Sequence, residues 1–157
     1  MKEMKMKNND MLEELFEMQS SLNDFTFQKK GIVDRSGLDL TMRTLFFHGS
    51  QDAHKLGPNT LTNEWLQKYL LAMNMESKEL QDELLVKWWS KDTLDMQNIR
   101  VEIIDQLHFW ISLAITSGMD AKKVYDIYCQ KNKVNIERQE LEYSKATKNE
   151  SDNKGIK

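Results

Sequence analysis

The sequence predicts an all-α protein, an antiparallel bundle of four long helices, and three observations support this. Only one proline and six glycines occur in 157 residues, so few positions impose a sharp turn. No segment shows alternating polar and apolar residues on both sides of a hairpin turn. Apolar residues instead recur at helical spacing, and helices of this kind bury their apolar faces against one another. The four stretches are residues 10–30, 62–90, 93–117 and 120–143.

The first helix is expected to begin at Asp10, whose carboxylate can cap free backbone amides. Gly31 stands where a left-handed C-terminal cap is common. Residues 31–61 hold four of the six glycines and the only proline, Pro58. We therefore expect an irregular connection here, with a short helix around TMRTLFF.

The second helix is expected to start near Thr62 and to continue to residue 90. Asp92 is the candidate N-cap of the third helix, Gly118 its terminator, and the fourth helix follows Asp120. Residues 145–157 are polar and lack periodicity, which predicts a disordered tail. The length suits one hydrophobic core, so a single domain is expected over residues 1–157.

The composition narrows the class of protein. The 22 basic residues are balanced by 25 acidic ones, for a net charge of −3, which gives no reason to expect nucleic acid or an anionic membrane as partner. No apolar run approaches the ~20 residues of a membrane span, and residues 1–10 lack the apolar part of a secretory signal. Cys129 is the only cysteine, so no disulfide can form within the chain. A cytoplasmic protein is expected.

Two pairs of carboxylates carry the strongest chemical signal. Glu102 and Asp105 share one side of the apolar helix VEIIDQLHFWI, where an uncompensated charge costs several kcal/mol or more. Glu76 and Glu79 have the same spacing on the preceding helix, and the two helices should pack antiparallel. Either pair alone could belong to a solvated helix face. Together they predict a site for Mg²⁺, or for Mn²⁺ in its place, whereas a di-iron site would need Glu-x-x-His pairs.

Polar side chains are also ordered on the first and fourth helices. Lys131, Asn135 and Arg138 share one face of the fourth helix, a pattern that suits phosphate groups or an ordinary solvated face. Gln19 and Asn23 lie one turn apart on the first helix and could read the edge of a nucleobase.

Together these segments resemble the dimeric all-α dUTP diphosphatases (dUTPases) of the all-α NTP pyrophosphohydrolase superfamily. The resemblance covers most of the chain outside residues 31–61 and the tail. QSSLND at 19–24 looks like the motif that contacts uracil, and KNKVNIERQ at 131–139 like the phosphate-binding motif. ESKELQDELLVKWW at 76–89 and NIRVEIIDQLHF at 98–109 are similar to the two metal-binding helices.

The resemblance implies a homodimer and a role for each matching residue. It assigns Mg²⁺ binding to Glu76, Glu79, Glu102 and Asp105, base binding to Gln19 and Asn23, and phosphate binding to Lys131, Asn135 and Arg138. Further residues that match and would line the site are Lys87, Trp89, Asn98, Asn132 and Gln139. His108 falls in the matching segment, where a structural hydrogen bond is expected rather than catalysis.

The expected activity is Mg²⁺-dependent conversion of dUTP, and of dUDP if the site accepts it, to dUMP. Water activated by the metal attacks the alpha-phosphorus, Glu79 accepts the proton, and pyrophosphate leaves when dUTP is the substrate. One departure is Glu142, which stands where the family's last motif has a glycine, so closure of the site by the tail is left open. Two alternatives also remain: a related pyrophosphohydrolase acting on dCTP or another dNTP, and a non-catalytic helical interaction protein.

Overall fold

The computed structural model describes residues 10–51, 56–140 and 150–157, and over these residues it confirms the all-α fold. A one-residue β-bridge joins Val33 and Asp39. The helices are α1 (Met11–Lys30), α2 (Met42–Gly49), α3 (Leu61–Glu83), α4 (Met96–Thr116), α5 (Ala121–Glu140) and the short 3₁₀ helix η2 (Glu150–Gly155).

The chain forms two compact units, Met1–Met119 and Asp120–Lys157. The expectation of a single domain stays a prediction.

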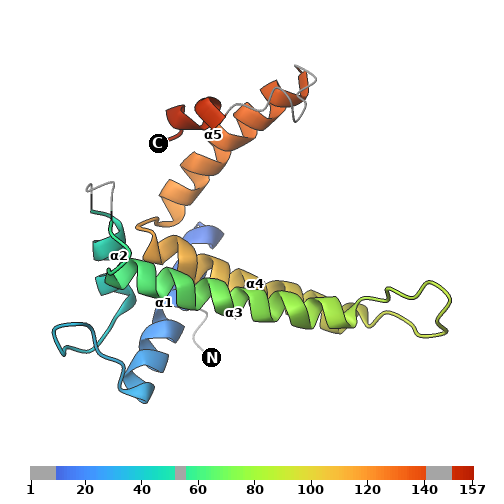
Figure 1. Cartoon of the computed structure of the whole chain (residues 1–157), viewed down its shortest axis with the longest axis horizontal. Helices are drawn as coiled ribbons and strands as arrows, with labels where there is room; N and C mark the ends of the chain where they lie inside the picture. The colour runs from blue at the N-terminus through green and yellow to red at the C-terminus, as the bar shows by residue number, and fades with distance from the viewer. Residues whose placement is uncertain (1–9, 52–55, 141–149) are drawn as a thin grey trace, which may run out of the picture. The chain divides into compact units, whose positions relative to one another are not determined.

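The first unit is built around the pair α3 and α4, which run side by side in opposite directions, with α1 lying across them (Figure 1). The short helix α2 packs against both members of the pair. Their apolar faces meet in a core in which Phe27 of α1 contacts Trp65 of α3 edge-to-face, with ring centroids 4.9 Å apart. Other buried members of the core are Phe16, Leu45, Ile99, Ile111 and Ile115. This core holds the antiparallel pair that the carboxylate prediction requires.

The ends of α1 lie where the sequence places them. The Asp10 carboxylate accepts a hydrogen bond from the backbone N–H of Leu12 at 3.0 Å, which satisfies one of the free amides of the first turn. Gly31 caps the other end at φ 61°, a conformation that a residue with a Cβ adopts only with strain.

Helix α3 ends at Glu83, earlier than the expected end near residue 90. Residues 84–95 form a connection that projects beyond the ends of α3 and α4 (Figure 1). Val86 and Trp88 in this connection are 86% and 87% exposed, and β-branched and aromatic residues lose side-chain freedom in a helix. Without packing to offset that cost, the helix does not continue.

Helix α4 begins at Met96, three residues later than expected, because Asp95 and not Asp92 is its N-cap. Asp95 accepts hydrogen bonds from the backbone N–H groups of Gln97 and Asn98, both at 3.1 Å. Asp92 instead bonds with Ser90 within the connection. Asp92 and Asp95 are both of a residue type that is common at the N-cap, so the sequence alone does not show which of them caps α4.

The short helix expected within residues 31–61 is α2. The Thr41 hydroxyl caps it by accepting from the N–H of Thr44 at 3.1 Å, and Asp24 of α1 accepts from the N–H of Met42 at 2.6 Å. These bonds hold α2 beside α1.

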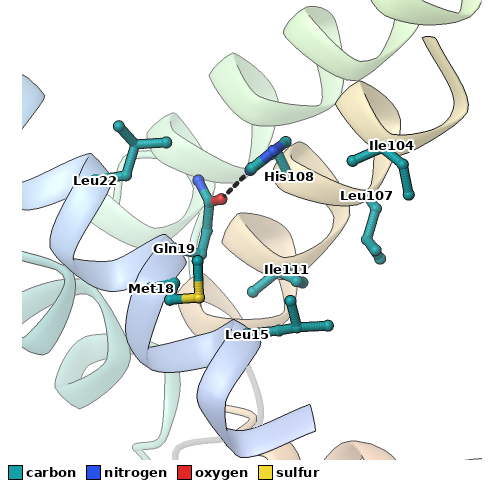
Figure 2. A pocket seen from close by; sticks show the side chains of 8 residues that line it. All are labelled: Leu15, Met18, Gln19, Leu22, Ile104, Leu107, His108 and Ile111. Carbon is teal, nitrogen blue, oxygen red and sulfur yellow. Dashed lines mark hydrogen bonds between the residues drawn. The ribbon is translucent and has the colours of Figure 1, made fainter. Parts of the chain in front are cut away.

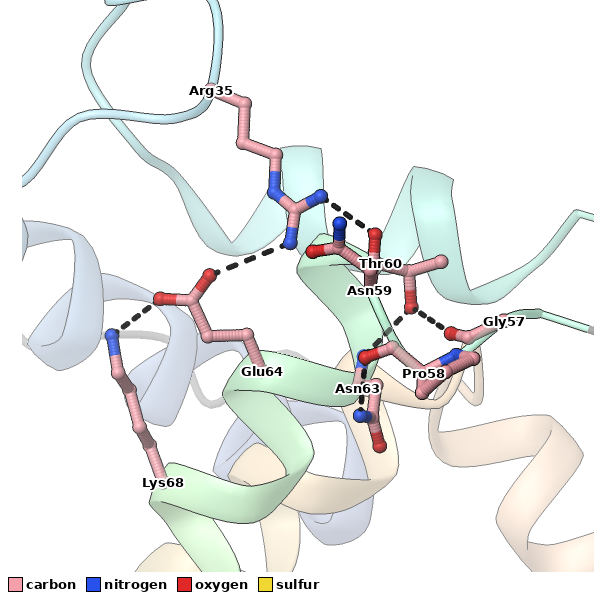
Figure 3. A network of polar contacts seen from close by, with 8 residues as sticks. All are labelled: Arg35, Gly57, Pro58, Asn59, Thr60, Asn63, Glu64 and Lys68. Atoms are coloured by element: carbon pink, nitrogen blue, oxygen red, sulfur yellow. Dashed lines mark hydrogen bonds and ion pairs between the residues drawn. The ribbon is translucent and has the colours of Figure 1, made fainter.

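Arg35, in the segment before α2, also forms polar contacts with residues at the start of α3 (Figure 3). Arg35 donates to the carbonyl of Asn59 at 2.7 Å and lies 3.8 Å from the carboxylate of Glu64. Lys68 pairs with the same carboxylate at 2.6 Å. These ion pairs are about half exposed, so each contributes at most about 1 kcal/mol, and their effect is to place the connection rather than to stabilise it strongly.

The end of α2 passes very close to the end of α4. A Cβ on Gly49 would lie 2.1 Å from the carbonyl oxygen of Thr116, and one on Gly118 would lie 2.5 Å from the backbone nitrogen of Ser50. Because both neighbours are backbone atoms, only glycine allows this approach.

In the second unit, α5 begins as expected after Asp120, which accepts from the N–H of Lys123 at 2.7 Å. The expected end of this helix near residue 143 lies outside the described residues. Positions 150–155 form η2, which differs from the expected disordered tail. Polar side chains of α5 bond with residues 152–157. They include Gln130, whose side chain exchanges two hydrogen bonds with the backbone of Lys157.

Candidate functional site

Three of the four predicted carboxylates come together on the facing sides of α3 and α4. Glu76, Glu102 and Asp105 each offer an oxygen, and these oxygens all lie within 4.8 Å of one another. All three side chains are half-buried. Beside them, Ser77 Oγ of α3 lies 2.8 Å from Gln106 Oε1 of α4 and 2.9 Å from the Met73 carbonyl, so a polar contact joins the two helices at this point.

Glu79, the fourth predicted carboxylate, lies at the edge of this cluster. It is exposed and does not belong to the group of oxygens within 4.8 Å. Its charge nevertheless acts on the cluster, since it contributes to the raised pKa of both Glu76 and Glu102. Its position one turn after Glu76 keeps it on the same side of α3.

The electrostatics of the cluster are those of crowded like charges. Burial, followed by the charges of Glu79, Asp105 and Glu102, raises the pKa of Glu76. Burial likewise raises the pKa of Glu102, with further contributions from Glu79, Asp105 and Glu83. Both shifts mean that the ionised carboxylates are held at a free-energy cost in the absence of a cation.

One carboxylate oxygen of the cluster has no hydrogen-bond partner among the described residues. This atom, Glu102 Oε2, is buried, an arrangement that is costly unless a cation or water binds there. The cluster offers only hard oxygen donors, which suit Mg²⁺ or Mn²⁺ rather than softer metals. The residues present therefore fit a divalent cation.

The two predicted base-binding residues join a hydrogen-bond network between α1 and α4. Gln19, which is 5% exposed, donates from Nε2 to Asn23 Oδ1 at 3.0 Å and to Ser112 Oγ at 3.2 Å. Asn23 Nδ2 also donates to Ser112 Oγ, at 2.8 Å. His108 Nδ1 lies 2.6 Å from Gln19 Oε1, so His108 makes the structural hydrogen bond that the sequence predicted for it.

This network lies beside a pocket of about 540 Å³ between α1 and α4 (Figure 2). Six of its lining residues are apolar, and Gln19 and His108 are the two polar ones. The apolar residues are Leu15, Met18, Leu22, Ile104, Leu107 and Ile111. An apolar pocket with a few convergent polar groups is a common form of small-molecule site.

The residues predicted to line the site with less defined roles are dispersed. Lys87 and Trp89 lie exposed in the projecting connection 84–95. Asn98 is half-buried in the first turn of α4, where its backbone N–H is bound by the Asp95 cap. Lys87 and Trp89 thus lie in the connection between α3 and α4 and not on the helices that carry the carboxylates.

The predicted phosphate-binding residues lie on α5 in the second unit. Lys131 donates to Asn153 Oδ1 at 2.5 Å, and Arg138 pairs with the carboxylate of Asp152 at 2.9 Å. The Arg138 guanidinium lowers the pKa of Asp152, chiefly through this hydrogen bond. The predicted amides Asn132, Asn135 and Gln139 are exposed. The two predicted cations therefore bond with residues of the C-terminal segment.

Sequence reasoning missed Glu83, whose charge adds to burial and to nearer carboxylates in raising the pKa of Glu102, and Ser112, which joins the network between α1 and α4. Glu83 follows Glu79 by four positions and Glu76 by seven, so extending the helical spacing would have found it. Ser112 follows His108 by four positions and is a small polar residue in the apolar run FWISLAI. The same argument that singled out Glu102, a polar group in an apolar helix, applies to Ser112.

Comparison with known proteins gives one matching protein family and two matching relatives. A family model described as dUTPase matches residues 11–124, the segment from α1 to the start of α5. A dCTP pyrophosphatase of Enterobacteria phage LZ5 is 26% identical over 153 residues, which cover 88% of this chain and 86% of that protein. A dCTP pyrophosphatase of Enterobacteria phage T4 is 29% identical over 80 residues, which cover 51% of this chain and 40% of that protein. No solved structure matches. In the described part of the chain, no helix has the length and apolar character to cross a membrane.

Proposed function

The chain belongs to the dUTPase family, and on that premise we propose that it hydrolyses a deoxypyrimidine nucleoside triphosphate. The products are the nucleoside monophosphate and pyrophosphate. The observation that carries this proposal is the cluster of Glu76, Glu102 and Asp105 between α3 and α4, with its unpartnered Glu102 oxygen. None of the three takes part in an ion pair with a described residue, and a structural role alone gives no reason to crowd carboxylates together in this way.

The cluster is proposed to hold Mg²⁺, with Mn²⁺ as a substitute. A divalent ion bound there would supply positive charge for the substrate phosphates and would make a water molecule more acidic. The cluster residues Glu76, Glu102 and Asp105 would bind it through their oxygens. Glu79 is proposed as a fourth ligand, at the exposed edge of the cluster.

Glu79 is also the proposed general base. It is an exposed carboxylate beside the half-buried cluster, and so can accept the proton of the attacking water. The new bond forms between the water oxygen and the alpha-phosphorus. The bond from this phosphorus to the bridging oxygen breaks, and pyrophosphate leaves with the electron pair. Lys131, Asn135 and Arg138 are proposed to bind phosphate groups.

Two deoxypyrimidine triphosphates are candidates for the substrate. The description of the family favours dUTP, and both relatives carry the name dCTP pyrophosphatase. Gln19 and Asn23 are the proposed base-binding residues, and Gln19 lines the pocket between α1 and α4. We expect the protein to distinguish dUTP from dCTP through the contacts that the base makes with these two residues and with the pocket.

The protein is further proposed to act as a homodimer in the cytoplasm. Large apolar side chains remain exposed on three helices of the first unit, a pattern that marks interaction surfaces when the side chains are contiguous. Examples are Phe25, Leu71, Met75, Val101 and Ile103. Sedimentation equilibrium of the whole chain measures the association directly.

A non-catalytic helical interaction protein is the competing explanation, and thermal melting separates the two. The proposal expects Mg²⁺ with a non-hydrolysable dUTP or dCTP analogue to raise the melting temperature, and a chelator to reverse the effect. Glu102→Gln should lose the shift. A melting temperature that responds to neither ligand nor chelator would leave the interaction protein as the better account.

A further inference from the structure

Ser112 of α4 is fully buried and lies at the centre of the network that joins α1 to α4. Its hydroxyl donates to the carbonyl of His108, one turn earlier, at 2.9 Å. A hydroxyl has one hydrogen and two acceptor lone pairs. Ser112 Oγ can therefore only accept from its other two partners, Gln19 and Asn23.

That restriction fixes the orientation of both amide groups. Gln19 directs its two amide hydrogens to Ser112 Oγ and to Asn23 Oδ1. Asn23 directs its own to Ser112 Oγ and to Met42 Sδ, the latter at 3.3 Å. All four amide hydrogens thus have partners within the protein, and only oxygen lone pairs remain to meet a ligand.

The orientation of Gln19 then fixes the tautomer of His108. Gln19 Oε1 is an acceptor, so His108 Nδ1, 2.6 Å away, must carry the hydrogen (Figure 2). In the neutral imidazole, Nε2 is consequently an acceptor. Since Gln19 and His108 are the polar residues of the pocket, its polar groups act as acceptors.

We propose that Ser112 is a specificity-determining positioning residue, which makes this pocket accept hydrogen bonds and so select a base that donates them from its 4-position. Cytosine carries an amino group with two N–H bonds at its 4-position, where uracil carries a carbonyl oxygen. Uracil still donates from its N3–H, so the discrimination arises where the acceptors of the pocket face the 4-position, at which they bind the amino group and disfavour the carbonyl oxygen. This inference rests on the proposed function and chooses dCTP over dUTP within it.

The test compares the whole wild-type chain with Ser112→Ala and with Thr116→Val. Thr116 is a matched control because it is equally buried on the same helix and donates its hydroxyl to the Ser112 carbonyl, not to Gln19 or Asn23. If Ser112→Ala does not fold by its thermal melt, Ser112→Cys replaces it, since a thiol of similar size is a poor acceptor.

The first readout is the ¹⁵N chemical shifts of the His108 ring in the nucleotide-free protein. Wild type and Thr116→Val should show the neutral ring protonated at Nδ1. A wild-type ring protonated at Nε2 would overturn the proposed polarity of the pocket. This measurement needs no enzymatic activity, so it stands apart from the proposed function.

The second readout is kcat/KM with Mg²⁺ for dCTP, dUTP and a dCTP analogue that lacks the 4-amino group. Wild type and Thr116→Val should prefer dCTP to both others by about tenfold or more, and Ser112→Ala should lose most of that preference through KM. A wild-type preference for dUTP, or an unchanged ratio in Ser112→Ala, would overturn the inference. If no triphosphate is hydrolysed, the proposed function fails, and the ratio of dCMP to dUMP affinities decides the base preference in its place.

Discussion

Glu76 of α3 and Glu102 of α4 bring carboxylate oxygens to within 4.8 Å of each other. Burial and the neighbouring acidic groups raise the pKa of both residues above the ordinary glutamate value of 4.5. The folded chain therefore holds these charges together at a cost, which a bound cation would offset. Catalysis, pH dependence and metal binding should all be altered by changes at these two positions.

Glu79→Gln should lower kcat by about 10²- to 10⁴-fold, because it removes the proposed general base without removing a member of the Glu76–Glu102–Asp105 cluster. Asp82→Asn is the matched control, an exposed acid of the same helix that pairs with Lys78, and should leave kcat nearly unchanged. Steady-state hydrolysis of dUTP and dCTP measures both. Full activity in Glu79→Gln would remove Glu79 from the mechanism.

The metal-free protein should lose stability as pH rises. Because the folded-state pKa of Glu102 lies above its unfolded value, the folded state binds more protons than the unfolded chain between the two values. The free energy of unfolding contributed by this group therefore falls through that interval and stays lower above it. Glu76 contributes in the same direction.

Thermal melts of wild type and Glu102→Gln in chelator isolate this effect. The variant should be more stable than wild type at neutral pH, and the difference should disappear as the pH falls below the ordinary glutamate pKa of 4.5, because the carboxyl is then protonated in both the folded and the unfolded state. Added Mg²⁺ should stabilise wild type and not the variant. A variant less stable than wild type at neutral pH in chelator would show that the Glu102 charge is already compensated within the protein.

Asp152→Asn should lower KM for a triphosphate if Arg138 binds phosphate, because Asp152 occupies the Arg138 guanidinium in the second unit. The pair is partly exposed, so the expected change is modest, up to about fivefold. Asp126→Asn serves as the control, since Asp126 pairs with Lys122 on the same helix. An unchanged KM in Asp152→Asn would argue against a phosphate role for Arg138.

Gly49→Ala should destabilise the first unit by about 1–3 kcal/mol or more, because the added Cβ would lie 2.1 Å from the carbonyl oxygen of Thr116. Gly57→Ala is the control, as a Cβ there meets no atom within 4 Å. Urea unfolding gives both values. Equal stability in the two variants would mean that α2 and α4 can separate without cost.

The features predictable from the sequence were those set by periodicity and local chemistry. The apolar spacing placed α1, α3, α4 and α5, and the Asp10 and Gly31 caps of α1 follow from their side chains and backbone preferences. The three clustered carboxylates could be predicted because an i, i+3 pair on each of two antiparallel helices must converge if the helices face each other.

Other features depend on tertiary packing that no local pattern encodes. Helix α3 ends at Glu83 because Val86 and Trp88, which follow it, are not buried by packing and remain exposed. The bonds of Lys131 to Asn153 and of Arg138 to Asp152 connect α5 to a tail without periodicity. The role of Ser112 requires knowing that α1 crosses α4 at that position.

Release of pyrophosphate from a panel of deoxynucleoside triphosphates tests the central claim most directly. With Mg²⁺, the wild-type chain should convert a deoxypyrimidine triphosphate to its monophosphate and pyrophosphate, and both chelator and Glu102→Gln should abolish the reaction while the helical content is retained. Absence of pyrophosphate with every nucleotide, or full turnover by Glu102→Gln, would contradict the account.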